Sequence, residues 1–485
     1  MSYRMKADGA CCKGRQGIIG SFLLWPSVSR QHFCREHSTP SSSPSLQFVV
    51  TMAENAVTEQ NGKDVDTPDN TVTPHSLVTE DHVQAALVAD KGAAARLISY
   101  RVVDFTKKGD NYACVVSSVE VKYELDDQSC EVVYVVKLNP CRNFESMKEF
   151  ISKLFEKEAK FYLNLVPDMN SILREIGEKT LKFPRCFYAS LEDKKEIIFL
   201  EDLRPLGYKM TDRRQGMDKA HVNLVLKELA RLHAASVLLQ AKAPDEDICV
   251  RYPSLEKGWI DFLKKESSFK LIFESGMKNS KELLLQLGGY ERATAWIDSL
   301  LPNFVDILQE QANDSKFKVV CHGDSWNNNL LFRYSEDGHP VDTMLLDLQL
   351  SGYSSPCTDL NYLMYTSMTG EVRRPDLDGF LSRYYDSFCS VLEAGNHEVP
   401  FTRAELQQDF KTRNVHGAIF AMVLLPFVIM EPDDVMDLEN GTDEDLDNMI
   451  DEMKQKSKNQ WESNSLLRPR FLAMFDELME AGVIP

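Results

Sequence analysis

The sequence lacks an apolar run long enough to cross a membrane. The longest such run, residues 418–430, is interrupted by Pro426 and falls short of the ~20 residues that a membrane-spanning helix needs. We therefore expect no membrane span and predict a buried core helix there. Basic charge is also scarce, with 55 Lys and Arg against 74 Asp and Glu and a formal net charge of −19. A nucleic-acid-binding face must neutralise phosphates, so this balance argues against nucleic acid as a partner.

Cysteine is present but not in patterns that bind metal or form a disulfide framework. The eleven cysteines include no C-x-x-C pair, and the odd count excludes a fully paired set. This usage is typical of a reducing compartment, and zinc is not expected. It therefore favours a cytoplasmic protein.

The N-terminal segment differs from the rest of the chain. Residues 1–52 carry six basic residues against two acidic ones and a Ser/Pro tract at 38–44, which is typical of a mitochondrial transit segment. The alternative, which we favour, is that Met52 is the usual start and the leader is optional. Residues 53–75 are polar and acidic without an apolar period. We predict that residues 1–75 are a disordered or optional leader.

Regular structure is expected from about Ser76. Thr79 begins a predicted helix, and strands are predicted at 97–105, 113–123, 131–138 and 196–200, with a helix at 145–165 between the last two. Beyond Leu203 the pattern is mostly helical, as at 221–239. We therefore divide the chain into a β-rich domain at 76–203 and a helical domain at 204–485.

The most informative motif lies in the helical domain. His322 and Asp324 form a His-x-Asp pair, Asn329 follows five residues after that Asp, and Asp347 ends an apolar run further on. Phosphoryl transfer needs a carboxylate that orients and deprotonates the attacking hydroxyl, and an amide oxygen and a second carboxylate that hold magnesium. We assign Asp324 to the first role and Asn329 and Asp347 to the second. The alternative is that all three only cap loops and turns.

Lys137 is the candidate that contacts the nucleotide phosphates. It stands at the tip of the valine-rich run 132–136, where a cation can reach phosphates if a carboxylate of the next helix holds it. Glu158 is the favoured partner, with Glu156 as the fallback. The alternative is a solvated lysine at the end of a strand.

Two further segments are expected beside the nucleotide. Gly109 and Asn111 lie in a turn between two predicted strands, where backbone N–H groups can bind an anion, although a plain hairpin turn fits equally well. Glu201 and Leu203 follow the last predicted strand, where a hinge would present backbone groups to adenine. Their side chains have a structural alternative as well.

Other polar residues near the motif are expected to be structural. We predict that His322 holds the loop by hydrogen bonds, that Asp359 anchors this loop to the helices, and that His233 is a satisfied core residue. Trp326 and Asn327 are expected to shape the loop beside the acceptor.

Together these residues resemble the ecdysteroid kinase-like family, small-molecule kinases related to choline and aminoglycoside kinases. The resemblance runs from about Ser76 to the C-terminus and rests on Gly109-Asp110-Asn111-Tyr112, Phe155-x-x-Glu158-x-x-Phe161-Tyr162, Leu200-Glu201-Asp202-Leu203, Leu229-Ala230-x-Leu232-His233-Ala234-Ala235-Ser236, His322-Gly323-Asp324-x-Trp326-x-Asn328-Asn329 and Asp347-Leu348-Gln349. It implies an α+β, two-lobed protein-kinase-like fold with a small β-rich N-lobe and a larger helical C-lobe. It also implies ATP and Mg²⁺ as cofactors, and phosphorylation of a hydroxyl on a small-molecule alcohol such as an ecdysteroid or xenobiotic. Cys114 and Leu348 depart from the family's usual Ser and Phe.

Three other functions remain as alternatives. A choline or ethanolamine kinase would need an aromatic and acidic cage for the amine, which the sequence neither shows nor excludes. A nucleotide-binding pseudokinase is disfavoured because Lys137, Glu158, Asp324, Asn329 and Asp347 are all present. A protein kinase is disfavoured because no Ala-Pro-Glu segment follows Asp347.

Overall fold

The computed structural model describes residues 73–105, 114–141, 145–255, 260–265, 268–429, 446–461 and 464–485. The leader predicted at 1–75 lies outside the described residues except for its last three. These begin at Thr73, which precedes a short 3-10 helix, Pro74–Leu77.

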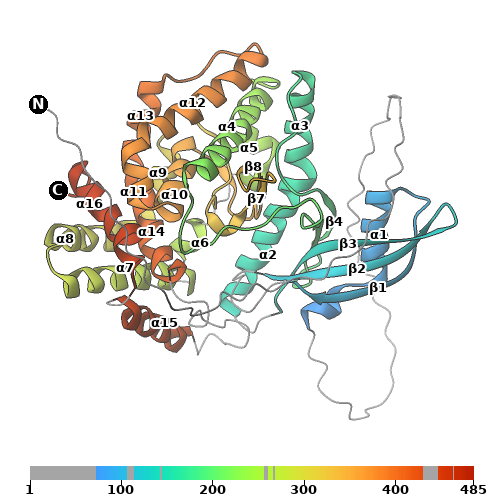
Figure 1. The fold of residues 1–485 in the computed structure, drawn as a ribbon, viewed down its shortest axis with the longest axis horizontal. Coiled ribbons are helices and arrows are strands. Elements are labelled where there is room, and N and C mark those ends of the chain that lie inside the picture. Colours follow the sequence, from blue (N-terminus) through green and yellow to red (C-terminus); the bar gives the residue numbers. More distant parts are fainter. Residues whose placement is uncertain are drawn as a thin grey trace, which may run out of the picture. The chain divides into compact units, whose positions relative to one another are not determined.

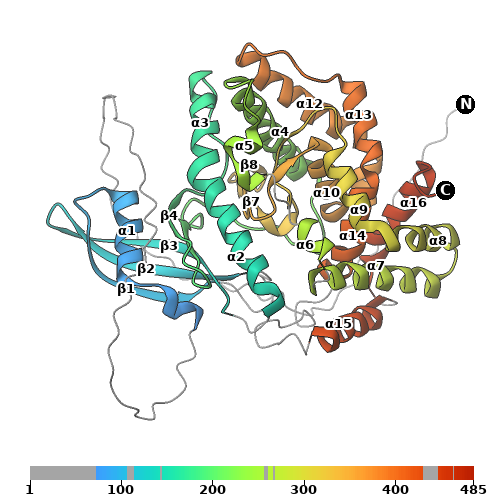
Figure 2. The ribbon, with the colours of Figure 1, turned by 180° about the vertical axis from the view of Figure 1, so that it is seen from behind.

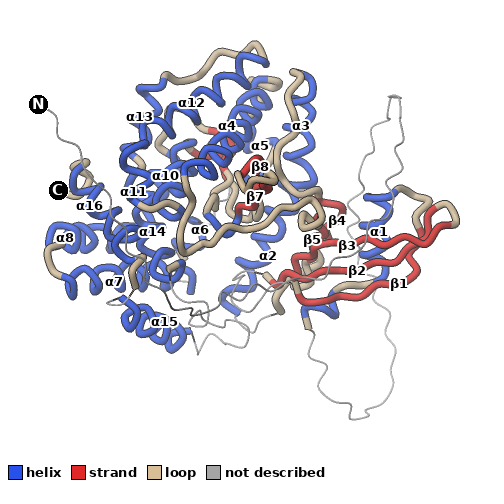
Figure 3. Tube along the Cα trace, in the orientation of Figure 1, coloured by secondary structure: helices blue, strands red, loops and turns tan. Residues whose placement is uncertain are grey.

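Five antiparallel strands form one sheet in the order β1-β2-β3-β5-β4 (Figures 1 and 3). Their bounds are β1 (Arg96–Asp104), β2 (Val115–Leu125), β3 (Gln128–Leu138), β4 (Cys186–Ser190) and β5 (Ile197–Glu201). Asp126 and Asp127 join β2 to β3 with φ of 51° and 60°. Positive φ at both positions gives a turn whose twist matches that of the flanking strands. The four predicted strands are confirmed as β1, β2, β3 and β5.

Strand β4 was not predicted. It pairs with β5 at the edge of the sheet, and only Phe187 among its five residues is buried. An edge strand with one buried side chain carries no clear alternation of apolar and polar residues, so its place depends on pairing with β5 rather than on its own pattern.

One α-helix precedes the first strand of the sheet in the chain, and a longer helical segment lies between β3 and β4. Helix α1 (Glu80–Lys91) begins where predicted, since the Thr79 side chain accepts a hydrogen bond from the His82 N–H, and it packs against β1 and β4. The helix predicted at 145–165 is present as α2 (Glu145–Lys160) followed by a π-helical turn, Phe161–Leu165. It continues into α3 (Val166–Glu175), so this helical segment is longer than predicted (Figure 2).

The chain beyond β5 is mostly helical (Figure 3). Its helices are α4 (Lys219–Ala241), α5 (Ile248–Arg251), α6 (Ile260–Lys264), α7 (Ser268–Leu287), α8 (Glu291–Leu300), α9 (Phe304–Asn313), α10 (Pro356–Ser367), α11 (Gly370–Arg373), α12 (Leu377–Ala394), α13 (Arg403–Thr412), α14 (Asn414–Val428), α15 (Leu446–Trp461) and α16 (Ala473–Glu480). Helix α4, predicted at 221–239, is the central one and is buried on almost every face. Such a helix supports its neighbours on several sides.

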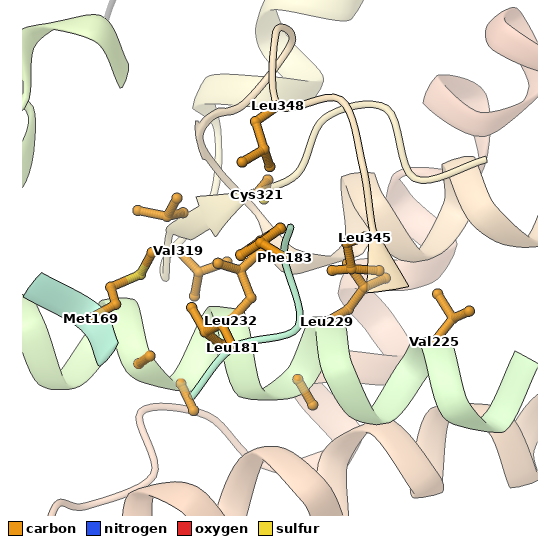
Figure 4. Close-up of a cluster of buried hydrophobic side chains, with 14 of the residues drawn as sticks. Met169, Leu181, Phe183, Val225, Leu229, Leu232, Val319, Cys321, Leu345 and Leu348 are labelled. Atoms are coloured by element: carbon orange, nitrogen blue, oxygen red, sulfur yellow. The ribbon is translucent and has the colours of Figure 1, made fainter. Parts of the chain in front are cut away.

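Two short antiparallel pairs lie among these helices. Strand β6 (Val319–Cys321) pairs with β9 (Gly352–Ser354), and β7 (Leu330–Tyr334) pairs with β8 (Pro340–Leu345). Figure 4 shows α4 supporting these strands through Val225, Leu229 and Leu232, which face Val319, Cys321 and Leu345. The loops between the strands are therefore held against a rigid core.

The apolar run at 418–430 forms the end of α14, up to Val428, with Ile429 following it. The core-helix prediction is confirmed for these residues, which are nearly all buried; Met430 lies outside the described residues. Among the helices that the structure describes, none is both long and apolar enough to cross a membrane.

Candidate active site

The His-x-Asp motif forms a buried loop after β6. Asn329 ends a 3-10 turn, Asn327–Asn329, and its Nδ2 donates to the Asp324 carboxylate oxygen Oδ2 at 2.8 Å and to the Asp324 carbonyl oxygen at 3.0 Å. The Asp324 N–H donates to Nδ1 of His322 at 3.2 Å. The loop-holding role expected of His322 is therefore confirmed, and Asp324 and Asn329 are in direct contact.

Asp359, on α10, anchors this loop as predicted. Its carboxylate accepts the backbone N–H of His322 at 2.7 Å and that of Gly323 at 2.8 Å. His233 lies 3.1 Å from the same carboxylate through Nε2 and 2.8 Å from the Tyr384 hydroxyl through Nδ1, so it is a satisfied core residue. Burial opposes the charge of Asp359, but these hydrogen bonds and the His233 contact lower its pKa.

The second carboxylate of the motif meets Lys137. The Lys137 Nζ lies 2.6 Å from Oε2 of Glu158 and 3.0 Å from Oδ1 of Asp347. Oε1 of Glu158 also accepts the Leu348 N–H at 3.3 Å. Glu158 of α2 therefore joins β3 to the segment after β8. Glu156 is not the partner, because it pairs instead with lysines of its own helix.

Asp347 adopts a backbone conformation that is uncommon for a residue with a side chain. Its φ is 64°, in the left-handed region, which Asp and Asn tolerate better than most residues. The side-chain oxygens accept Lys137 Nζ and, at 3.2 Å, Nε2 of Gln349. Asp347 lies two residues after β8, and its unusual backbone conformation sets the direction of its side chain.

Burial and neighbouring charges shift the pKa values of Lys137 and Asp324. Burial disfavours the charge of Lys137, but Asp347 and Glu158 outweigh it and raise the pKa of Lys137 well above its ordinary value. Burial and the nearby charge of Asp347 raise the pKa of Asp324 to about 7, although hydrogen bonds from Tyr362 and Asn329 oppose that rise. A carboxyl that titrates near neutral pH is suited to accept a proton from a substrate.

The sequence model of the ecdysteroid kinase-like family matches residues 108–397. This range is more than half of the chain and includes Lys137, Glu158, Asp324, Asn329 and Asp347. The chain belongs to the ecdysteroid kinase-like family. None of the curated proteins matches the chain. Membership suggests a kinase-like small-molecule kinase, and the five residues that the structure brings together fit that class.

Tyr362 belongs to the site of this ecdysteroid kinase-like protein, and the sequence reasoning missed it. Its hydroxyl donates to Oδ1 of Asp324, and both side chains are buried. Because Asp359 was expected to face the loop, the residue three positions later on the same helix face could have been a candidate. Its mainly apolar neighbours in the sequence are typical of a core tyrosine and do not indicate a site residue.

Of the residues predicted beside the nucleotide, the structure describes Glu201 and Leu203. Gly109 and Asn111 lie outside the described residues. Glu201 ends β5 and donates its N–H to the Arg185 carbonyl at 2.9 Å. Leu203 is buried, and its carbonyl accepts bonds from the turn that follows, at 3.2 and 3.3 Å. Their proposed role toward adenine therefore rests on position at the end of β5, and not on side-chain contacts.

Asn327 is a structural residue of the loop. It is buried, its Oδ1 accepts the Thr211 hydroxyl at 2.8 Å, and its N–H donates to Oγ of Ser367 at 3.0 Å. Trp326 is partly buried and packs against the hydrophobic cluster that includes α7 and α14. These contacts attach the loop to the helices.

Gly323 should be the least replaceable residue of the loop. Its φ is 82°, and a Cβ there would lie 2.1 Å from the Leu350 carbonyl oxygen. We expect Gly323→Ala to lower the free energy of unfolding by ~3 kcal/mol or more, because a backbone atom must move. Chemical denaturation would measure this.

The matched control is Gly177→Ala. Gly177 has a φ of 78° with nothing within 4 Å of the added Cβ, so only the left-handed conformation is penalised, by about 1 kcal/mol. Equal losses in the two variants would show that the contact with Leu350 contributes nothing.

Proposed function

We propose that this protein is a kinase that transfers the γ-phosphoryl group of Mg-ATP to the hydroxyl of a small-molecule alcohol. One observation carries the proposal: Lys137 is bonded to both Glu158 and Asp347, in the site where Asp324 contacts Asn329. A nucleotide-binding cation, a proton acceptor and two oxygen ligands for magnesium are the parts that phosphoryl transfer requires. We further propose the two-lobed arrangement, with ATP bound between the sheet and the helical part of the chain.

The donor set fits a hard cation. Because Nδ2 of Asn329 donates to Asp324, the amide oxygen Oδ1 is the atom of Asn329 that would hold a metal ion, and Asp347 would supply a carboxylate. Mg²⁺ prefers such oxygens and commonly takes its remaining ligands from phosphates and water. When bound, it would neutralise charge on the nucleotide phosphates.

The chain's own residues would then divide the work. Lys137, held by Glu158, binds the α- and β-phosphates. Asp324 orients the acceptor hydroxyl and takes its proton as the oxygen attacks the γ-phosphorus and ADP leaves. Around the nucleotide, we propose that the turn with Gly109 and Asn111 covers the phosphates and that the backbone between Glu201 and Leu203 meets adenine.

For the acceptor we propose a neutral steroid or phenolic alcohol. The family favours an apolar hydroxylated molecule, and the net charge of −19 gives no reason to expect an anion. A panel of hydroxylated steroids, plant phenols, choline, ethanolamine and a protein serine substrate, assayed for ATP-dependent phosphorylation by mass spectrometry, tests this choice. We expect product from a steroid or phenol.

Two results of that panel would contradict the proposal in different ways. Turnover of choline with kcat/KM of about 10⁴ M⁻¹s⁻¹ or more, with none on steroids or phenols, would support the choline-kinase alternative. Mg-ATP binding without turnover of any acceptor would support a nucleotide-binding pseudokinase.

We propose a cytoplasmic location, on the basis of the scattered positions and the odd number of the cysteines. The basic leader supports mitochondria as the alternative. Import of the full-length chain, but not of residues 53–485, into isolated mitochondria would overturn the cytoplasmic proposal.

A further inference from the structure

The Asp324 carboxylate is held from both of its oxygens. The Tyr362 hydroxyl donates to Oδ1, and Nδ2 of Asn329 donates to Oδ2 at 2.8 Å. Only 8% of Asp324 and 3% of Tyr362 are exposed. Inside a protein, hydrogen bonds to a charged acceptor are stronger than neutral ones and fix its orientation. With one donor on each oxygen, the carboxylate cannot rotate about its last bond without breaking a contact.

Tyr362 is in turn held rigidly. Its ring lies against Phe420 of α14, with 4.6 Å between the ring centroids. Its carbonyl accepts the Thr366 hydroxyl at 2.6 Å. Because the aromatic contact and the helix both restrict the ring, they also restrict the position of the hydroxyl oxygen.

Helix α14 approaches α10, the helix that carries Tyr362, closely. A Cβ at Gly417 of α14 would lie 2.6 Å from Cδ2 of Tyr365 and 2.9 Å from the carbonyl oxygen of Asn361. A glycine at this contact lets α14 pack directly on α10. Helix α14 lies beyond the residues matched by the family, so the support for Tyr362 comes partly from the C-terminal part of the chain.

Helix α10 therefore contacts the loop in two ways. Asp359 holds the backbone at His322 and Gly323, and Tyr362 holds the side chain of Asp324. These two residues are three positions apart, on one face of the helix. A single rigid element thus sets both the backbone of the loop and the direction of its carboxylate.

We propose that Tyr362 is a positioning residue of the active site, whose hydroxyl holds the Asp324 carboxylate in the orientation that meets the acceptor hydroxyl. This inference rests on the proposed function. A carboxylate held in the reactive direction needs no reorganisation when the acceptor binds. Losing the Tyr362 hydroxyl should therefore slow the chemical step without weakening nucleotide binding.

The test compares Tyr362→Phe with Tyr365→Phe. Tyr365 lies one turn further along α10, is equally buried, and its ring contacts Arg373. Turnover is measured as ADP release from Mg-ATP, with water and with each alcohol of the panel as acceptor. We expect Tyr362→Phe to lower kcat by about ten- to a hundredfold with KM for Mg-ATP within about twofold. Tyr365→Phe should change neither value by more than about twofold.

A double-mutant cycle separates positioning from general stability. In an Asp324→Asn background, Tyr362→Phe should change the residual turnover by less than about twofold, because the proton acceptor that Tyr362 orients is already removed. Phe420→Leu, which keeps the hydroxyl but loosens the ring behind it, should give a smaller fall in kcat at unchanged KM. It provides the test if Tyr362→Phe does not fold.

The possible failures are distinguishable. Turnover that depends on Asp324 but is unchanged in Tyr362→Phe would overturn this inference and leave the proposed function standing. A fall in kcat of the same size in the Asp324→Asn background would assign Tyr362 a merely structural role. If the wild-type protein showed no turnover that depends on Asp324, both the proposed function and this inference would be overturned.

Discussion

Asp324→Asn is expected to abolish turnover while leaving the affinity for Mg-ATP within a few-fold of the wild-type value. The amide has nearly the same shape, and its oxygen can still accept the Tyr362 hydroxyl that Asp324 accepts now. What is lost is the group that takes the acceptor proton, which is worth roughly 10²–10⁴ in rate. Single-turnover kinetics and calorimetry measure the two quantities separately.

The matched control is Asp337→Asn. Asp337 lies in the turn between β7 and β8 with 71% of its side chain exposed, so the same chemical change there should leave kcat and Mg-ATP affinity unaltered. If Asp324→Asn retained more than about a tenth of wild-type turnover, Asp324 would not be the proton acceptor.

Asp347→Ala is expected to remove the magnesium dependence of nucleotide binding. A hard cation has few protein ligands in this site, and the carboxylate also contacts Lys137. We expect the affinity for Mg-ATP, measured by calorimetry, to approach that for ATP in excess EDTA. Unchanged Mg-ATP affinity would place the metal ion elsewhere.

Asp347→Asn separates the charge from the backbone. Because Asp347 has a φ of 64°, alanine there adds conformational strain, whereas asparagine tolerates the left-handed region. We expect Asp347→Asn to lose most of the magnesium dependence as well. If only the alanine variant lost it, the backbone turn and not the carboxylate would explain the effect.

The contact between Lys137 and Glu158 shows how much of this site the sequence pattern predicts. A lone cation at the tip of a valine-rich strand, followed by a helix that carries Glu156 and Glu158 in its second half, favours one of these two glutamates as the partner. Helical geometry does not choose between them with certainty. The structure does, because Glu156 lies between Lys153 and Lys160 on its own helix while Glu158 is buried against Lys137.

The sequence pattern predicts neither strand β4 nor the contact of Tyr362 with the loop. The strand is recognised by its hydrogen bonds to β5, and the tyrosine by its contact with a residue 38 positions away. Local sequence contains neither relation. The turn with Gly109 and Asn111 lies outside the described residues and stays a prediction.

The sequence by itself determined the chemistry available to this protein: the His-x-Asp loop with Asn329, the Asp347 after an apolar run, and the strand that ends in Lys137. Those assignments depend on spacing along short segments, which the periods of helix and strand convert into position. Only the tertiary structure decided that Tyr362 joins Asp359 in contacting the loop from α10, and that α14 packs behind them. These choices depend on burial and close packing between segments far apart in the chain, where a side chain's partner is set by the space its neighbours leave.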